Sequence, residues 1–224
     1  MSGKFELPGA HRVFFMYMID SLSLTSFCKY AIIEQKNGGL FVEEFETLTL
    51  PTYIKPGLDI VFCGINPGRI SALKGYHFAN PANLFWKGLY LGGITPYQFK
   101  PEETEKLLDY GYGITDIVGR ATRSSSDLKK EDFVKGAAEL RKLITKYKPK
   151  CLCFIGITAF RHATNRQKDR IVPGLQDGLF YSTDEWEGCH IFVVHSTSGA
   201  NAHYTREERI DYFRQLNEWN NSQK

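Results

Sequence analysis

The strongest constraint on the fold is an apolar run that stops at a sharp turn. Residues 60–65 are almost entirely apolar, and Asn66-Pro67-Gly68 follows them directly. Pro67 has a fixed φ angle and no amide hydrogen, whereas Gly68 tolerates a left-handed conformation. The pattern predicts a buried strand that ends in a tight turn. Because ligands bind at the carboxyl edge of open parallel sheets, we expect Asn66 to be the first polar side chain at such an edge.

The order strand, loop and helix then repeats along the chain. Strands are predicted over residues 60–65, 113–118, 151–155 and 189–194, and helices over residues 83–91, 101–110, 133–147, 158–166 and 205–216. Thr205 and Glu208 have the spacing of a capping box at the start of the last helix. The alternation predicts an α/β fold with a mostly parallel sheet that helices cover on both faces.

Residues 1–57 have a different character. Their apolar pieces alternate with Ser, Thr and Gly-Gly turns and have no helical period. This pattern predicts an amino-terminal extension that contains a hairpin. Pro51, Pro56 and Gly57 mark a boundary, so residues 58–224 form the second domain.

Composition restricts the function classes. The 28 Lys and Arg residues nearly balance the 25 Asp and Glu residues, so any nucleic-acid surface must be local. The number of cysteines is odd, and they are Cys28, Cys63, Cys151, Cys153 and Cys189. Four of them lie in or beside apolar runs, which is typical of reduced structural thiols in an intracellular protein. Their spacing does not fit a zinc site. The apolar run 13–19 is too short to span a bilayer, so no membrane partner is expected.

Two loops carry the candidate chemistry. The first holds His77, Phe78 and two asparagines ahead of Trp86, and an aromatic and amide-rich pocket suits a planar base. The Asn-Pro-Gly segment before it is also ordinary turn chemistry. The second loop, residues 195–199, offers hydroxyl groups to a phosphate or simply connects a strand to a helix. No Walker, Gly-x-Gly-x-x-Gly, His-Glu-x-x-His or Gly-x-Ser-x-Gly motif is present.

Several separate motifs resemble one family. They are Gly64-Ile-Asn-Pro-Gly68, Lys74-Gly-Tyr-His-Phe78, Asn80-Pro-Ala-Asn83, Phe85-Trp86-Lys87, Tyr112-Gly-Ile-Thr115 and Ser196-Thr-Ser-Gly-Ala-Asn201. In order and spacing the chain resembles the mismatch-specific uracil and thymine DNA glycosylases of the uracil-DNA glycosylase superfamily over about residues 58–220. The resemblance implies a three-layer α/β/α sandwich with a short, mostly parallel central sheet. It makes residues 58–224 a DNA glycosylase domain.

The resemblance also implies roles for individual residues. Asn66 matches the catalytic asparagine that positions the attacking water, and Phe78 matches the ring that stacks on the flipped base. The other expected substrate-binding residues are Ile65, Ser71, His77, Asn83 and Thr122. The expected DNA-binding residues are Lys74, Ser196, Thr197, Ser198, Gly199, Ala200 and Asn201. No cofactor or metal is expected.

The chain departs from the family pattern at two positions. Ala200 stands at the intercalating position, where the family has a larger side chain. Asp116 stands at a pocket edge where the family often has an amide or a cation. Asp116 is either a second catalytic group, which stabilises an oxocarbenium ion or orients water, or an ion-pair partner of a nearby arginine such as Arg120. When Gly199-Ala200 is aligned with the family's intercalating segment, His195 falls one residue before the position of the superfamily's catalytic histidine. It is therefore not assigned to catalysis.

The expected function is a monofunctional DNA glycosylase that removes uracil or thymine, and modified cytosines, opposite guanine. Its expected partners are double-stranded DNA with a mismatched or damaged base and downstream abasic-site repair enzymes. The protein is expected to be a monomer in the nucleus of a eukaryote, or in the cytoplasm otherwise. Two alternatives stay open: a weakly catalytic protein that senses mismatched or abasic DNA, and a hydrolase of free nucleosides.

Overall fold

The computed structural model describes residues 4–6, 13–15, 31–36, 39–176, 186, 188–201 and 203–224, with side chains from residue 45 onward. The chain divides into two compact units, residues 1–48 and 49–224. Residues 49–57, expected in the amino-terminal extension, therefore belong to the second unit. Tyr53 pairs with Ile114 in an antiparallel bridge, which explains this assignment. Cys28 lies outside the described residues.

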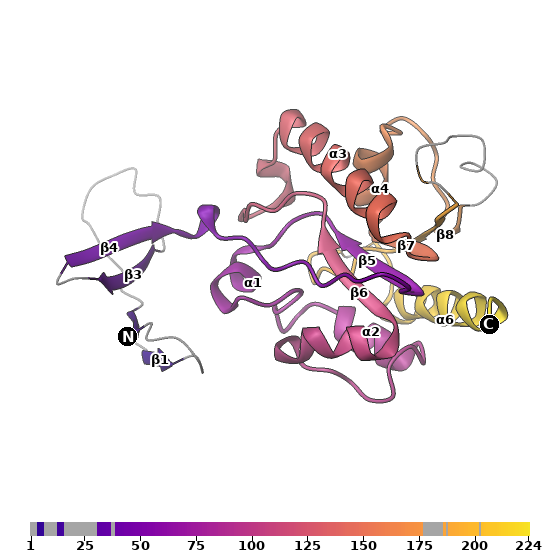
Figure 1. Cartoon of the computed structure of the whole chain (residues 1–224), viewed down its shortest axis with the longest axis horizontal. Coiled ribbons are helices and arrows are strands. Elements are labelled where there is room, and N and C mark those ends of the chain that lie inside the picture. The colour runs from indigo at the N-terminus through magenta and orange to yellow at the C-terminus, as the bar shows by residue number, and fades with distance from the viewer. Residues whose placement is uncertain are drawn as a thin grey trace. The chain divides into compact units, whose positions relative to one another are not determined.

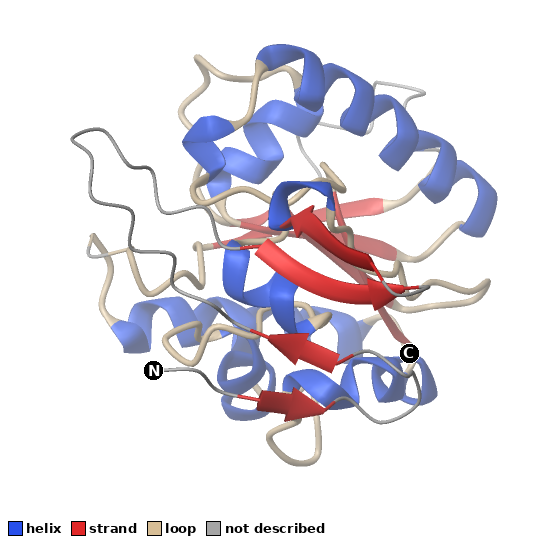
Figure 2. Cartoon of the chain, turned by 90° about the vertical axis from the view of Figure 1, so that its left-hand side faces the viewer, coloured by secondary structure: helices blue, strands red, loops and turns tan. Residues whose placement is uncertain are grey.

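The first unit contains one antiparallel sheet. Its strands follow the order of the sequence and are red in Figure 2: β1 (Lys4–Glu6), β2 (Val13–Phe15), β3 (Ala31–Lys36) and β4 (Gly39–Glu44). Strands β3 and β4 pair over their full length, from Ala31 opposite Glu44 to Lys36 opposite Gly39. A 3-10 turn, η1 (Phe45–Thr47), follows β4.

The second unit is built on a five-stranded sheet in the order β6-β5-β7-β9-β8. Its strands are β5 (Ile60–Gly64), β6 (Tyr112–Asp116), β7 (Cys151–Ile155), β8 (Gly174–Leu175) and β9 (His190–Val194). The four strands predicted from apolar runs all form, and they pair in parallel. The short antiparallel strand β8 at the sheet's edge was not predicted, because two residues carry no periodic signal.

Helices lie between the parallel strands and after the last of them. They are α1 (Arg69–Lys74), α2 (Phe85–Leu91), η2 (Pro101–Tyr110), η3 (Ser125–Asp127), α3 (Lys130–Tyr147), α4 (Ile157–Thr164) and α6 (Arg206–Ser222). The predicted helix over residues 101–110 is a 3-10 helix, and the six-residue α1 was not predicted. The predicted capping box of α6 is confirmed, because the Glu208 amide donates to Thr205 Oγ1 and Glu208 Oε2 accepts from the Thr205 amide.

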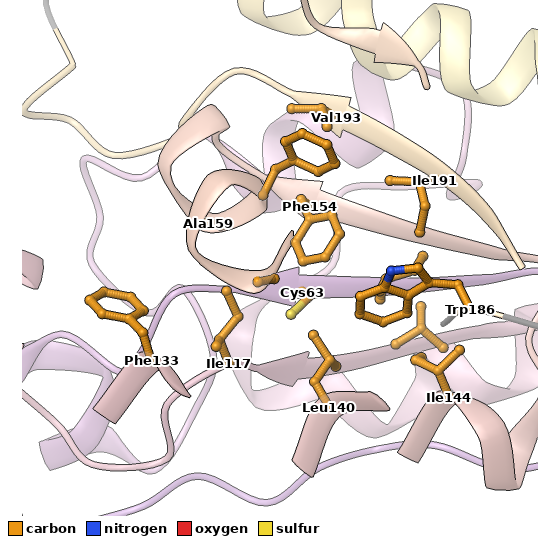
Figure 3. Packing of buried hydrophobic residues seen from close by; sticks show 14 of the residues in the cluster. Cys63, Ile117, Phe133, Leu140, Ile144, Phe154, Ala159, Trp186, Ile191 and Val193 are labelled. Carbon is orange, nitrogen blue, oxygen red and sulfur yellow. The ribbon is translucent and has the colours of Figure 1, made fainter. Parts of the chain in front are cut away.

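Helices cover both faces of this sheet, as Figure 1 shows for α3 and α4 on one side and α2 and α6 on the other. Successive strand residues point to opposite faces. Phe62 therefore belongs to the core under α2 and α6, and Cys63 to the core under α3 and α4. Figure 3 shows Cys63 in the core under α3 and α4, with Leu140 and Ile144 of α3. The predicted three-layer α/β/α sandwich is confirmed.

The cysteines within this unit lie mainly in its strands. Cys63, Cys151 and Cys153 are buried and Cys189 is partly buried, and all four are free thiols. In the described part of the chain, no helix has the length and apolar character needed to cross a membrane.

Candidate active site

The carboxyl ends of the parallel strands border a cleft of about 600 Å³. Most of the predicted site residues line it: Ile65, Asn66, Ser71, His77, Phe78, Asn83, Asp116, Thr122, Ser196, Thr197, Ser198 and Ala200. Three predicted DNA-binding residues, Lys74, Gly199 and Asn201, are outside its lining. The sheet thus gathers into one cleft predicted site residues that are up to 135 positions apart, from Ile65 to Ala200.

Sequence patterns did not single out several residues of the lining: Leu50, Arg69, Ile70, Ser124, Ser125 and Ile155. Arg69 begins α1, a helix too short to recognise by its periodicity. Ile155 ends β7 and was predicted only as part of a buried strand. Its position was the available signal, because the last residue of a parallel strand lies at the edge where ligands bind.

The amide nitrogen of Asn66 is held by a set of acceptors. Nδ2 donates to Thr122 Oγ1 at 2.7 Å, to the Arg120 carbonyl at 3.1 Å and to the Pro67 carbonyl at 3.2 Å. Among the described residues, Oδ1 accepts no hydrogen bond. The arrangement fixes which end of the amide faces the cleft, and the end it leaves for a ligand is the carbonyl oxygen.

Thr122 is fixed by the same turn that carries Asn66. Its amide donates to the Pro67 carbonyl at 3.1 Å, and it forms a parallel bridge with Gly68. Thr122 is only 2% exposed. Its hydroxyl therefore has little freedom to turn away from Asn66. Thr122 was predicted to bind substrate, and the structure places it in the cleft as a support for Asn66.

A buried ion pair lies at the end of β6. Asp116 Oδ2 is 3.2 Å from Nδ1 of His77, whose side chain is 3% exposed. Nε2 of the same ring is 2.8 Å from the Pro51 carbonyl. Both ring nitrogens face acceptors, and only the imidazolium form can donate to both. Burial alone lowers the pKa of His77, but the charge and hydrogen bond of Asp116, with the Pro51 carbonyl, raise it above its ordinary value.

Arg120, the partner suggested for Asp116, binds another carboxylate. Its Nη2 and Nε donate to Asp132 at 2.6 and 3.1 Å. These hydrogen bonds, with one from the Lys129 amide, lower the pKa of Asp132 to about 2. Asp132 lies in the first turn of α3, where a carboxylate also caps the helix. Of the two explanations for Asp116, the ion pair exists, but its partner is His77 rather than Arg120.

Gly64 makes room for the Asp116 carboxylate. A Cβ at position 64 would collide with Asp116 Oδ1 and would lie 3.3 Å from Cζ of Phe78. No larger residue fits without displacing one of these side chains. Gly64 thus allows the carboxylate and the ring to meet at the end of β5.

Phe78 provides the aromatic wall of the cleft. One side of its ring stacks on Phe85, with ring centroids 4.1 Å apart and planes 23° apart, and the side chain also lines the cleft. Its φ angle of 51° is in the left-handed region, which is unusual for a bulky residue. A backbone held in this way commonly belongs to a functional site.

Hydrogen bonds on both sides hold the backbone around Phe78. The Ala79 amide donates to Oγ of the buried Ser71 at 3.1 Å, and the Trp86 indole donates to the His77 carbonyl at 3.1 Å. Ser71 was predicted to contact the base. In the structure its hydroxyl already supports the loop that presents Phe78.

Asn83 connects the same loop to α2. Its Oδ1 accepts from the Phe85 amide at 2.9 Å, and its own amide donates to the Asn80 carbonyl at 2.8 Å. Because Oδ1 is occupied, the side-chain NH₂ is the group that Asn83 has left for a ligand in the cleft.

The loop after β9 packs closely against the loop before α2. The Leu84 amide donates to the Thr197 carbonyl at 2.9 Å, and a Cβ at Gly199 would lie 2.7 Å from Cβ of Ala82. Thr197 is 1% exposed, and its Oγ1 has no hydrogen-bond partner among the described residues. An unpaired buried hydroxyl is costly, and Thr197 also belongs to the lining of the cleft.

Internal hydrogen bonds shape the rest of this loop. The Ala200 amide donates to Ser198 Oγ at 3.3 Å, and the Asn201 side chain donates to the Ser196 carbonyl at 3.1 Å. Arg209 of α6 donates to the Ser198 carbonyl at 3.1 Å. Asn201 and Arg209 therefore hold the loop, while Ser198 and Ala200 are exposed at the cleft.

His195 is outside the lining of the cleft. It is 4% exposed, and its ring stacks on Tyr204 with centroids 3.6 Å apart and meets the edge of Tyr212. Burial lowers its pKa. It is thus a packed core histidine in this structure.

The cleft combines three chemical functions. Asn66 offers a fixed carbonyl oxygen that can orient a water, Phe78 offers a face for a planar ring, and Asp116 offers a carboxylate in the same cleft. Arg69 and Arg123 also line the cleft and suit a polyanion. In the described residues, no group of three or more His, Cys, Asp or Glu side chains could hold a metal ion.

A model of the uracil DNA glycosylase superfamily matches residues 51–220. The match covers most of the chain, which therefore belongs to this superfamily. Membership implies a DNA glycosylase, a hydrolase that releases bases such as uracil from DNA.

A solved structure has a similar fold. It is the solution NMR structure of a protein from Methanosarcina acetivorans that is provisionally named a uracil DNA glycosylase. The two chains superpose with a TM-score of 0.51 at 20% identity, over 76% of this chain and 98% of the other. At this identity the similarity concerns the fold.

Proposed function

We propose that the protein is a monofunctional DNA glycosylase that removes uracil or thymine, and modified cytosines, mispaired with guanine in double-stranded DNA. The observation that carries the proposal is the clamped Asn66 amide, which presents Oδ1 to a cleft with an aromatic wall at Phe78. The mismatch specificity rests on the motif resemblance. Base excision repair would then continue with enzymes that act on abasic sites, in the nucleus if the protein is eukaryotic and in the cytoplasm otherwise.

In the proposed reaction the target base leaves the duplex and stacks on Phe78. Asn66 Oδ1 accepts a hydrogen bond from a water and directs its oxygen at C1′ of the sugar. The C1′–N bond breaks with its electron pair moving to the base, which leaves as an anion and takes up a proton. The water oxygen becomes the hydroxyl group of the abasic sugar and loses a proton.

Asp116 has a defined place in this reaction. Its Oδ1 lies over Gly64 beside Phe78, while Oδ2 is paired with His77. A carboxylate held there can stabilise positive charge that develops on the sugar. A neutral amide such as Asn66 is a weak activator of water, so the reaction depends on positioning and turns over slowly.

The test is base release from duplexes with a single G·U, G·T or modified-cytosine pair, in the presence of EDTA. The proposal predicts abasic product from at least the G·U duplex. No product from any duplex, or product only after a metal is added, would refute it.

One observation favours a second candidate, a protein that senses mismatched or abasic DNA without turnover. Ala200 gives the loop a small side chain where intercalation into a base stack usually uses a larger apolar one. Gel-shift binding to abasic or mismatched duplexes, without base release at enzyme excess, would support this candidate. Release of uracil from free deoxyuridine would instead favour a nucleoside hydrolase.

A further inference from the structure

A second cavity of about 610 Å³ adjoins the catalytic cleft. It is lined by Ser125, Ser126, Leu128, Lys130, Phe133, Thr158, His162, Asn165 and Gln167. Ser125 of η3 lines both spaces. The cavity therefore adjoins the edge of the proposed active site at Ser125, although none of the motifs discussed above contributes to it.

The polar groups of the second cavity are uncharged or positive. Lys130 supplies an ammonium group, and no Asp or Glu belongs to the lining. Ser126 and Thr158 supply hydroxyl groups, while Asn165 and Gln167 supply side-chain amides. Side chains of these types make most of the contacts to phosphate groups in protein–DNA complexes.

Two of the carboxylates near η3, those of Asp127 and Asp132, are engaged in hydrogen bonds. Asp127 Oδ2 accepts from the Ser124 amide at 3.0 Å. Asp132 forms its ion pair with Arg120. Glu131 is exposed and lies outside the lining of the cavity. The positive charge of Lys130 is thus not matched by a carboxylate within the cavity.

The base of the cavity is formed where α3 packs on α4. The Phe133 and His162 rings stack there, with centroids 3.7 Å apart and planes 13° apart. Burial lowers the pKa of His162, so at neutral pH the ring can donate and accept hydrogen bonds without charge. Two packed helices give the cavity a fixed shape.

We propose that this cavity binds a backbone phosphate of the DNA strand that leaves the catalytic cleft past η3. The inference rests on the proposed function and names a contact outside the reacting nucleotide. Arg123 and Ser124 line the cleft, Ser125 lines both spaces, and Lys130 lines the cavity, so side chains that can donate to phosphate occur on both sides of Ser125. A strand that passes η3 places successive phosphates against them.

The test uses the full chain and measures the Kd for a G·U duplex by fluorescence anisotropy over a range of NaCl concentrations. Lys130→Gln should raise Kd about 10-fold, since hydrogen bonds to charged groups contribute on this scale. It should also reduce the slope of log Kd against log salt by about 0.9, the value for one phosphate contact. The rate of base release at saturating protein should not change, because Lys130 is outside the catalytic cleft.

Lys135→Gln is the matched control. Lys135 is exposed on the same helix but does not line the cavity, so its replacement should leave both Kd and slope unchanged. Thr158→Val should raise Kd without altering the slope, because it removes a neutral donor. A duplex shortened on the side that reaches the cavity should bind wild type and Lys130→Gln equally.

Equal effects of Lys130→Gln and Lys135→Gln would overturn this proposal. The proposal would also be overturned if Lys130→Gln weakened the binding of inorganic phosphate but not the binding of the duplex. The cavity would then hold a small anion rather than DNA. If wild type releases no base but Lys130→Gln still alters duplex binding, the proposed function fails and the phosphate contact stands. If base release occurs and Lys130→Gln has no effect, only the phosphate contact fails.

Discussion

Replacement of Thr122 by Val tests whether the hydrogen bonds that hold the Asn66 amide govern the reaction. The two side chains have nearly the same shape, so the change removes the hydroxyl that accepts from Nδ2 at 2.7 Å and leaves no cavity. The carbonyls of Arg120 and Pro67 remain. A neutral hydrogen bond contributes about 1 kcal/mol, with a range of about 0.5–1.5.

If that free energy holds Asn66 in its reactive orientation, its loss should slow base release about fivefold, because about 1.4 kcal/mol corresponds to a factor of ten. Stability should fall by about 1 kcal/mol for the same reason. Thr122→Ser keeps the hydroxyl and should restore most of the rate.

The assay is single-turnover base release from a G·U duplex at saturating enzyme, together with the Kd of the same duplex. If the Thr122 hydroxyl acts by holding Asn66, Thr122→Val should have a lower maximal rate and an unchanged Kd. A weaker Kd with an unchanged maximal rate would show that Thr122 contacts the substrate. A rate equal to wild type, or one that Thr122→Ser does not restore, would refute the reasoning.

Three further changes test other parts of the site. Gly64→Ala should cost about 1–3 kcal/mol of stability through overpacking against Asp116, whereas Gly68→Ala, where a Cβ meets nothing within 4 Å, should be neutral in the same denaturation experiment. Because Asp116 raises the pKa of His77 in the folded protein, the ion pair contributes fully below the unfolded pKa of about 6.5 and its contribution is lost as pH rises through the higher folded value. Urea denaturation across that range should show this loss in wild type and not in Asp116→Asn; equal profiles would contradict it. Ala200→Leu should strengthen binding to a mismatched duplex, because a larger apolar side chain fills the space of a flipped base; weaker binding in a gel shift would argue against that position in the duplex.

The sequence predicted the parallel strands and the residues at their ends because both follow from local patterns. Apolar runs identify buried strands, and parallel pairing brings their carboxyl ends to one edge. Asn66 was expected at that edge, and it lines the same cleft as Asp116 and Ser196.

The partners of these side chains were not predictable in the same way. Arg120 lies four residues after Asp116 and was the nearest candidate in sequence, yet its side chain binds Asp132 at the start of α3. His77 comes from a loop 39 positions earlier than Asp116, and only the tertiary fold brings the two together. The support of Asn66 by backbone carbonyls likewise has no sequence signal, because every residue has a carbonyl.

The central claim is that Asn66 Oδ1 orients the water that cleaves the glycosidic bond. The most direct measurement is single-turnover base release from a G·U duplex in EDTA by wild type and Asn66→Ala, with duplex Kd as a control for folding. We predict that Asn66→Ala binds the duplex normally and reacts at least about 100-fold more slowly, on the scale of lost positioning. Base release by Asn66→Ala at the wild-type rate would contradict the claim and assign the chemistry to Asp116.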